Sequence, residues 1–201
     1  MNHFLPALMG LVYLNHLCIR RYFMPPANDA SLARDLRPFG NRNWRVIYFF
    51  CGINVVVLLY VIYPDLLSWS ALPLPECVRW VGVLVGLAAN ILWAFAHRAL
   101  GGNWAPAGIK IKDGPHLLVT TGPYRQIRHP LYTVMYMLTV SFFLISGSLL
   151  VMIPWLHNSL LLAGHARREE KALTDQYGES YVEYSRRTGM LFPRILKGAG
   201  T

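Results

Sequence analysis

Four apolar segments constrain how this chain of 201 residues can fold. They cover residues 4–19, 46–63, 78–95 and 131–163. A helix that crosses a membrane needs about 20 mostly apolar residues, and each segment has this character. Only 14% of the residues are charged, against roughly 25% in an ordinary soluble protein. The sequence therefore predicts an all-α integral membrane protein.

The fourth segment is too long for one membrane helix. Its 33 residues would form a helix of roughly 50 Å, whereas the hydrocarbon core is about 30 Å thick. The sequence "ISGS" (145–148) lies in its middle and is typical of a tight turn. We expect two short antiparallel helices, each about 22 Å long, with a kink at Pro154 in the second. This gives five transmembrane helices, of which the fourth and fifth form a short hairpin.

The positive charges lie almost entirely on one side of these segments. Of the 19 Lys and Arg residues, 18 fall in residues 20–45, 98–128 and 167–197, and Arg79 is the exception. This is the positive-inside pattern, which predicts an N-terminus outside and a cytoplasmic C-terminus. It also explains the net charge of +9, because a basic face meets the anionic headgroups of the bilayer. Nucleic-acid binding is therefore not expected.

Other short patterns exclude further classes of site. Cys18, Cys51 and Cys77 have no C-x-x-C spacing and are expected to be reduced thiols. No metal-binding spacing of His and Cys occurs in the sequence, so no metal site is expected. The N-terminus lacks the basic region and cleavage site of a signal peptide, so we expect the first apolar segment to be retained. The compact length favours a prokaryotic inner membrane, with the endoplasmic reticulum as the alternative.

A predicted cytoplasmic loop of 33 residues, 97–129, precedes the fourth helix. Loops beyond about 12 to 15 residues are usually functional or disordered, and the apolar residues within this one predict an ordered structure. It ends in "TTGPYRQIRHPLY", where Pro130 suits the first position of a helix. The amides of that first turn, beside Arg128 and His129, would make an anion site. The alternative is an interfacial anchor, in which these residues and the neighbouring tyrosines lie at the level of the lipid headgroups.

Glu169 and Glu170 follow the fifth predicted helix. Adjacent residues on a helix point about 100° apart, so we expect the two carboxylates to have different roles. One would face inward and accept hydrogen bonds from a cationic or hydroxylated ligand. The alternative is an ordinary solvated face, in which the glutamates pair with nearby Arg and Lys side chains.

Four segments in a fixed order resemble one known family. They are "RHPLYTV" (128–134), the hydrophobic hairpin, Glu169-Glu170, and "GESYVEY" (178–184) followed by "LFP" (191–193). With the upstream "LGGNW" and "HLLVTTGPY", they resemble the isoprenylcysteine carboxyl methyltransferase family and its relatives among membrane phospholipid methyltransferases. The resemblance covers about residues 100–193 and is closest to the short prokaryotic members with five membrane helices. One position departs from the family pattern, because its glycine after R-H-P-x-Y-x is Val134 here.

The resemblance implies a single membrane methyltransferase domain, 1–201. Three N-terminal helices and their cytoplasmic loop would occupy 1–99, and the catalytic core with a C-terminal helix would occupy 100–193. S-adenosylmethionine would bind at the cytoplasmic mouth. The cofactor-binding positions implied by the family pattern are His116, Leu117, Leu118, Val119, Tyr124, His129, Pro130, Leu131, Tyr132, Glu169 and Glu170. A cation near the glutamates would orient the acceptor, and His165 and Arg168, with Arg167 adjacent, are its candidates.

The implied reaction is methyl transfer to the C-terminal carboxylate of a prenylated cysteine or a similar lipophilic acceptor, as in a protein-S-isoprenylcysteine O-methyltransferase. The lipid tail of the acceptor would enter between helices from the bilayer. Methylation of a phospholipid amine or a small thiol is an alternative within the same chemistry. An NADPH-dependent reductase of the sterol type and a non-catalytic membrane protein are alternatives from other classes.

Overall fold

The computed structural model of the protein describes residues 4–23, 54–101 and 118–194. Within these ranges the chain forms helices and turns and contains no β-strand. The elements in chain order are α1 (Phe4–Phe23), the 3₁₀ helix η1 (Pro64–Ser70), α4 (Glu76–Leu100), the 3₁₀ helix η3 (Gly122–Arg125), α5 (Pro130–Ser146), α6 (Leu149–Tyr177) and α7 (Glu179–Arg187). Residues 54–62 are also helical. The all-α prediction is confirmed.

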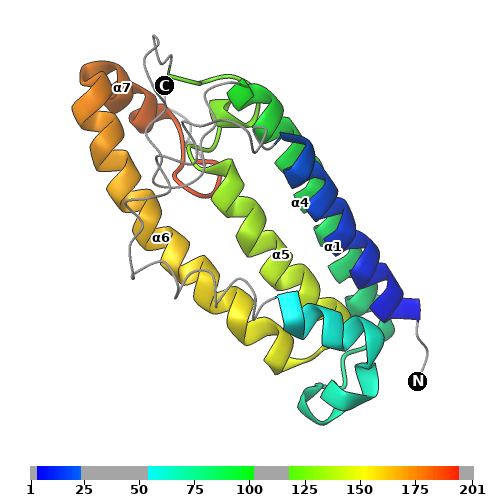
Figure 1. Ribbon diagram of the computed structural model, residues 1–201. Helices are drawn as coiled ribbons and strands as arrows, with labels where there is room; N and C mark the ends of the chain where they lie inside the picture. Colours follow the sequence, from blue (N-terminus) through cyan, green and yellow to red (C-terminus); the bar gives the residue numbers. More distant parts are fainter. Residues whose placement is uncertain (1–3, 24–53, 102–117, 195–201) are drawn as a thin grey trace, which may run out of the picture.

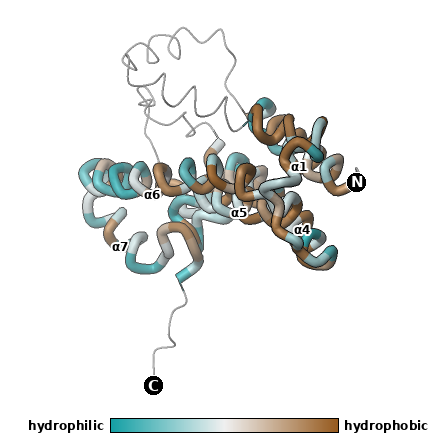
Figure 2. Tube along the Cα trace, turned by 90° about the horizontal axis from the view of Figure 1, so that it is seen from below, coloured by the Kyte–Doolittle hydropathy of each residue, from teal (hydrophilic) through white to brown (hydrophobic). Residues whose placement is uncertain are grey.

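The long helices lie alongside one another, and α5 contacts α1, α4 and α6 (Figure 1). The start of α1 and η1 lie at one end of the bundle, whereas η3 and α7 lie at the other (Figure 1). Figure 2 shows hydrophobic residues along α1, α4 and α5, and hydrophilic residues over the last part of α6 and over α7. The polar residues of the candidate site therefore gather at the η3–α7 end.

The predicted hairpin within residues 131–163 is confirmed, because α5 ends at Ser146 and α6 begins at Leu149. Gly147 between them has a φ of 69°, in the left-handed region that favours glycine. A Cβ at this position would lie 2.8 Å from the carbonyl oxygen of Leu72. Arg79 donates to the carbonyl oxygen of Ile145 at 2.9 Å. The one cation outside the three basic segments thus stabilises this turn.

The prediction of two short helices was wrong for α6. This helix has 29 residues, about 43 Å at 1.5 Å per residue, instead of about 22 Å. It runs through Pro154 and continues beyond the apolar part, 149–163, into the charged segment 164–177. That segment is rich in Ala, Arg, Glu and Lys, which have high helix propensity. The extension carries Glu169 and Glu170 on a regular helix.

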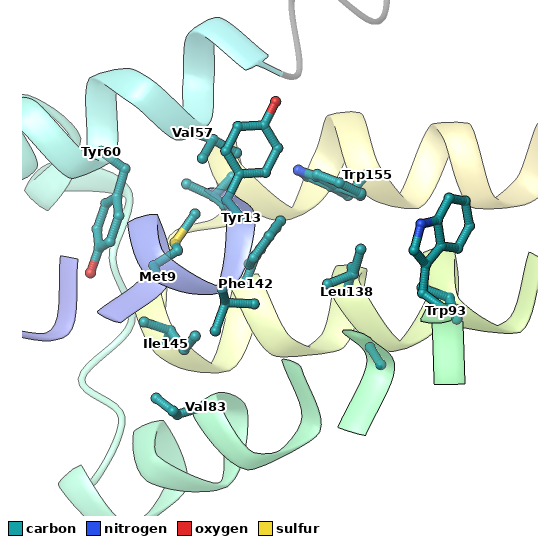
Figure 3. Packing of buried hydrophobic residues seen from close by; sticks show 14 of the residues in the cluster. Met9, Tyr13, Val57, Tyr60, Val83, Trp93, Leu138, Phe142, Ile145 and Trp155 are labelled. Carbon is teal, nitrogen blue, oxygen red and sulfur yellow. The ribbon is translucent and has the colours of Figure 1, made fainter. Parts of the chain in front are cut away.

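Small residues allow α4 to pack closely against its neighbours. A Cβ at Gly82 would lie 2.8 Å from Cβ of Leu144, and one at Gly86 would lie 2.6 Å from Oγ of Ser141. The Ser141 hydroxyl donates to the carbonyl oxygen of Gly82 at 2.8 Å. Figure 3 shows part of the apolar cluster to which α1, α4, α5 and α6 contribute. Val134, at the position of the family glycine, is fully buried in this cluster. The larger side chain is therefore part of the core.

Within the described ranges, two helices, α4 and α6, are long and apolar enough to cross a membrane, and α5 is a shorter apolar helix. On α4 the face opposite the glycines is also apolar. Leu84, Ile91 and Phe95 follow each other at helical spacing and are 63%, 58% and 57% exposed. A helix of a soluble protein normally has a polar face there, whereas a helix in lipid is apolar all round. The packing of α4 therefore agrees with a membrane environment.

Candidate active site

The start of α5 and the charged end of α6 bring together residues that lie about forty positions apart in the sequence. Arg128 Nε lies 2.6 Å from Oε1 of Glu170. His129 Nε2 lies 3.3 Å from the same carboxylate oxygen. The Tyr132 hydroxyl donates to Oε2 of Glu169 at 2.9 Å. Four of the residues that the family pattern implied for the cofactor, His129, Tyr132, Glu169 and Glu170, thus form one cluster.

The two glutamates have different environments, as their positions on a helix predicted. The Glu170 side chain is 23% exposed. Burial alone would raise the pKa of Glu170, but hydrogen bonds from His129 and Arg128 outweigh it and lower the pKa to about 2. The Glu169 side chain is 48% exposed, receives one hydrogen bond from Tyr132, and lies 3.7 Å from Nδ1 of His129. Glu169 is therefore the carboxylate with capacity to accept hydrogen bonds from a ligand.

Arg128 also connects this cluster to the end of α7 and to the segment that follows it. Its Nη1 donates to the carbonyl oxygens of Ser185 at 2.9 Å and Thr188 at 2.5 Å. Its backbone N–H donates to the carbonyl oxygen of Gly189 at 2.8 Å, and that of His129 donates to Met190 at 3.0 Å. This structural role was missed in the sequence, because no local pattern indicates that carbonyl groups some sixty residues later would be its acceptors. The R-H-P segment was the only signal.

The backbone amides at the start of α5 do not form the expected open anion site. Pro130, the first residue of α5, has no N–H, and the N–H of His129 is bonded to Met190. The N–H groups of Tyr132 and Thr133 both donate to the carbonyl oxygen of His129 at 3.1 Å. The amides of His129, Tyr132 and Thr133 are therefore engaged within the protein, which leaves less of an anion site than the sequence predicted. Leu131 is half-buried and packs against the apolar cluster.

Tyr124 supports the site from η3. Its side chain is 7% exposed, and its carbonyl oxygen accepts a hydrogen bond of 2.7 Å from the hydroxyl of Tyr184 on α7. Burial raises the pKa of Tyr124, so the phenol stays neutral. Leu118 and Val119 precede η3 and are half-buried. His116 and Leu117 lie outside the described residues.

His165 and Arg168, the predicted acceptor-orienting residues, are exposed on α6. His165 lies one helical turn before Glu169, so the two share a face of the helix. Neither side chain has a hydrogen bond or an ion pair with another residue of the described part of the chain. Their role stays a prediction. In the same part of the chain, no group of three or more His, Cys, Asp and Glu side chains is placed to hold a metal ion.

The local charge of the cluster is opposite to that of the whole protein. One arginine faces two glutamates, which leaves one negative charge uncompensated when His129 is neutral. The chain as a whole carries a net charge of +9. A negative site within a basic surface attracts a cationic group of a ligand.

Comparison with known proteins identifies relatives of this chain. The family model for the isoprenylcysteine carboxyl methyltransferase (ICMT) family matches residues 80–175. The chain is 29% identical over 173 residues, covering 85% of this chain and 73% of the relative, to the cobalt-zinc-cadmium resistance protein CzcN of Cupriavidus metallidurans. It is 26% identical over 141 residues to the protein-S-isoprenylcysteine O-methyltransferase of Xenopus laevis; the match covers 68% of this chain and 46% of that protein.

The matched region contains α5 and the part of α6 that carries Glu169 and Glu170. The matches support a membrane protein that transfers methyl groups. The resemblance seen in the sequence is confirmed: residues 80–175 carry the pattern of the isoprenylcysteine carboxyl methyltransferase family.

Proposed function

We propose that the protein transfers a methyl group from S-adenosylmethionine to a lipophilic acceptor at the cytoplasmic face of a membrane. The observation that carries this proposal is the cluster at the start of α5, where His129 and Tyr132 meet Glu169 and Glu170. The four side chains come from two separate segments of the family pattern and make one negative site. S-adenosylmethionine carries a sulfonium and an ammonium group, so its charge is complementary to this site.

The residues of the cluster fit such a cofactor. Glu169 would accept hydrogen bonds from the ammonium group or the ribose hydroxyls, because half of its side chain is exposed and Tyr132 holds it in place. His129 would lie against the cofactor next to Pro130 and Leu131. Glu170 would contribute mainly by fixing His129, because Arg128 already neutralises its charge. His116, Leu117, Leu118, Val119 and Tyr124 would complete the site from the preceding loop.

The membrane arrangement that we propose has five spanning helices, with the cluster at the cytoplasmic end. The basic residues that flank the helices support this orientation through the positive-inside rule. The exposed apolar face of α4 supports contact with lipid. A prokaryotic inner membrane is the location that we propose, with the endoplasmic reticulum as the alternative.

When bound, S-adenosylmethionine would supply an electrophilic methyl group for in-line transfer to the acceptor, and S-adenosylhomocysteine would be the leaving group. A carboxylate acceptor is already ionised at pH 7, so the protein needs no general base for it. The work of the protein is then to align the two molecules and to exclude water. His165 or Arg168 would orient the acceptor carboxylate by its charge. The name of the Xenopus relative supports a prenylated cysteine as the acceptor.

Calorimetric titration with S-adenosylhomocysteine tests the cofactor site. We expect Glu169→Ala to weaken binding at least tenfold, because the accessible carboxylate is removed. Glu183→Ala is the matched control: the side chain of this glutamate on α7 is 69% exposed, and its ion pair in the described part of the chain is with Arg187. Equal affinity in the wild type and Glu169→Ala would show that the site is assigned wrongly.

Transfer of a labelled methyl group identifies the acceptor. The purified protein in detergent is given N-acetyl-S-farnesylcysteine, phosphatidylethanolamine and a small thiol in separate reactions. We expect base-labile label on the farnesylcysteine. Label on only the amine or the thiol would support the proposed cofactor site but show that the acceptor is not a prenylated cysteine. A protein that neither transfers methyl groups nor binds S-adenosylhomocysteine would contradict the proposed function.

A further inference from the structure

The 3₁₀ helix η1 has three faces of different character. A 3₁₀ helix has three residues per turn, so residues three positions apart lie on the same face. Pro64 and Leu67 lie on one face and are buried against the protein. Asp65 and Ser68 lie on a second face, which is polar and exposed. These two faces are those of an ordinary surface helix.

The third face is apolar and is also exposed. Leu66 and Trp69 lie on it within η1, and Tyr63 before η1 and Leu72 after it continue the spacing of three. In chain order, from Tyr63 to Leu72, the four side chains are 61%, 57%, 77% and 42% exposed. We call these four residues the apolar stripe. A tryptophan that is three-quarters exposed in water is unfavourable, so the stripe needs a partner that removes it from water.

Hydrogen bonds fix η1 to the turn between α5 and α6. The hydroxyl groups of Ser70 and Ser148 are hydrogen-bonded at 2.6 Å. The N–H of Leu72 donates to the carbonyl oxygen of Gly147 at 3.0 Å. Leu67, on the opposite side of η1 from solvent, belongs to the apolar cluster. The apolar stripe is thus held in a defined position at the end of the bundle opposite η3 and α7 (Figure 1).

Helix α4 relates this position to the surface that faces lipid. Arg79, near the start of α4, contacts the same α5–α6 turn through the carbonyl oxygen of Ile145. The next residue, Trp80, is 40% exposed and lies one turn before Leu84 on the exposed apolar face of α4. From Trp80 to Arg98 the helix rises about 27 Å, close to the hydrocarbon thickness of about 30 Å. The start of α4 and the stripe therefore lie where one boundary of the bilayer is expected.

The size and composition of the stripe select lipid as its partner. A stable protein interface buries about 1,200 Å² or more and uses roughly 20–30 residues a side, which four side chains do not supply. Tryptophan and tyrosine are enriched at the boundary between membrane and water, because their rings are apolar and carry a polar atom. The polar face with Asp65 and Ser68 lies about 120° away around η1, so it stays in water when the stripe enters the lipid.

We propose that η1 is an interfacial segment, whose apolar stripe lies among the headgroups and upper acyl chains of the phospholipid leaflet opposite the candidate active site. Short helices with one apolar and one polar face bind membranes in this way. In this position η1 fixes the α5–α6 turn at the membrane boundary. The inference concerns the contact with lipid, so it stands or falls independently of methyl transfer.

Nitroxide labels measure the depth of each face of η1. The full chain, with its three cysteines replaced by serine, is labelled at one introduced cysteine at a time and reconstituted in phosphatidylcholine vesicles. Leu66→Cys and Trp69→Cys probe the stripe, and Asp65→Cys and Ser68→Cys probe the polar face. The measurement is the ratio of the collision rate with oxygen, which dissolves in lipid, to that with a nickel chelate, which stays in water. We expect this ratio to be at least threefold higher on the stripe.

Two further positions calibrate the ratio. Leu84→Cys lies on the exposed apolar face of α4 and gives the value for lipid, and Glu183→Cys on α7 gives the value for water. Ratios on both faces of η1 equal to that of Glu183→Cys would place η1 in water and overturn the proposal. Low collision rates with both reagents on the stripe would overturn it too, because another protein or a second copy of the chain would then cover the stripe.

A fluorescence measurement serves if the cysteine-free chain does not fold. The emission that Trp69→Phe loses relative to the wild type is the emission of Trp69. Brominated phosphatidylcholine should quench this emission, more strongly with bromine near the headgroup than with bromine at the end of the acyl chain. Absence of quenching would contradict the proposal. Titration with S-adenosylhomocysteine is the separate test of the proposed function, and neither result decides the other.

Discussion

Two regions of the molecule are stabilised by different kinds of contact. One is the α4–α5 interface, and the other is the junction at which α5 and α6 meet the end of α7 and the segment after it. At the interface, glycines bring helices so close that a single added methyl group would overlap Ser141 or Leu144. At the junction, Arg128 makes an ion pair with Glu170 and hydrogen bonds to two carbonyl oxygens. The interface depends on shape and the junction depends on charge. Substitutions and pH should therefore affect the two regions separately.

Removal of the Arg128 side chain should have the largest effect. Arg128→Gln leaves Glu170 and two carbonyl oxygens without their donor, and breaking a partly buried ion pair of this kind costs about 3 kcal/mol of unfolding free energy. Affinity for S-adenosylhomocysteine should fall at least tenfold. Arg128 fixes both Glu170, which contacts His129, and the end of α7, so its loss should displace the residues of the site. Chemical unfolding in detergent and calorimetry measure the two effects.

Arg187→Gln is the control for this variant, because its side chain is 70% exposed in a surface pair with Glu183. A change below about 0.5 kcal/mol is expected there. A similar loss of unfolding free energy in Arg128→Gln and Arg187→Gln would mean that the junction does not depend specifically on Arg128.

Low pH should weaken the junction by a similar amount. The pKa of Glu170 is lowered from 4.5 to about 2 in the folded protein. A lowered pKa stabilises the folded state above pH 4.5, and this contribution is lost as the pH falls from about 4.5 towards 2. The shift corresponds to something on the order of 3 kcal/mol. The unfolding free energy of Glu170→Gln should therefore fall less over this range than that of the wild type. Parallel curves of unfolding free energy against pH for the two proteins would contradict this.

Two glycine substitutions give the sharpest contrast within helices. At Gly86 an added Cβ would lie 2.6 Å from Ser141 Oγ and 2.7 Å from Val12 Cγ1, whereas at Gly164 the nearest atom, Arg168 Nη2, is 4.0 Å away. Gly86→Ala should destabilise by about 1–3 kcal/mol through overpacking. Gly164→Ala should stabilise by up to about 1 kcal/mol, because alanine has the higher helix propensity. Thermal unfolding measures whether each variant is destabilised or stabilised relative to the wild type. A stabilised Gly86→Ala would show that the interface is not tight.

The smallest expected effect concerns the tyrosine that holds Glu169. Tyr132→Phe removes one hydrogen bond of about 0.5–1.5 kcal/mol, so affinity for S-adenosylhomocysteine should fall about threefold to tenfold. Tyr136→Phe, four residues along α5, removes a hydrogen bond to the carbonyl oxygen of Ser159. It should leave that affinity unchanged. A loss of affinity in Tyr136→Phe and none in Tyr132→Phe would show that Tyr136, and not Tyr132, supports the cofactor site.

The sequence predicts the helical elements well where one physical property decides them. Apolar length indicates α1, α4 and the hairpin, and the glycine at position 147 marks its turn. The extension of α6 was missed because the hydrophobic pattern ends at residue 163. High helix propensity continues beyond that residue, and α6 continues to Tyr177. The second predicted segment, 46–63, is described only from residue 54, where it is helical.

The candidate site was predictable in part. The family pattern named His129, Tyr132, Glu169 and Glu170, and these residues contact one another. The engagement of the amides of Arg128 and His129, just before α5, was not predictable, because their acceptors lie in residues 189–190, far along the chain. Contacts between distant segments depend on packing, which local sequence does not encode.

The hydrogen bonds between Arg128 and residues 185–189 impose an order on biosynthesis. A chain is made from its N-terminus, so the membrane helices are complete before the segment that finishes the junction has been translated. The α5 turn that carries His129 therefore acquires its final geometry at the end of synthesis. The long helices are thus made first, and the candidate site is completed last.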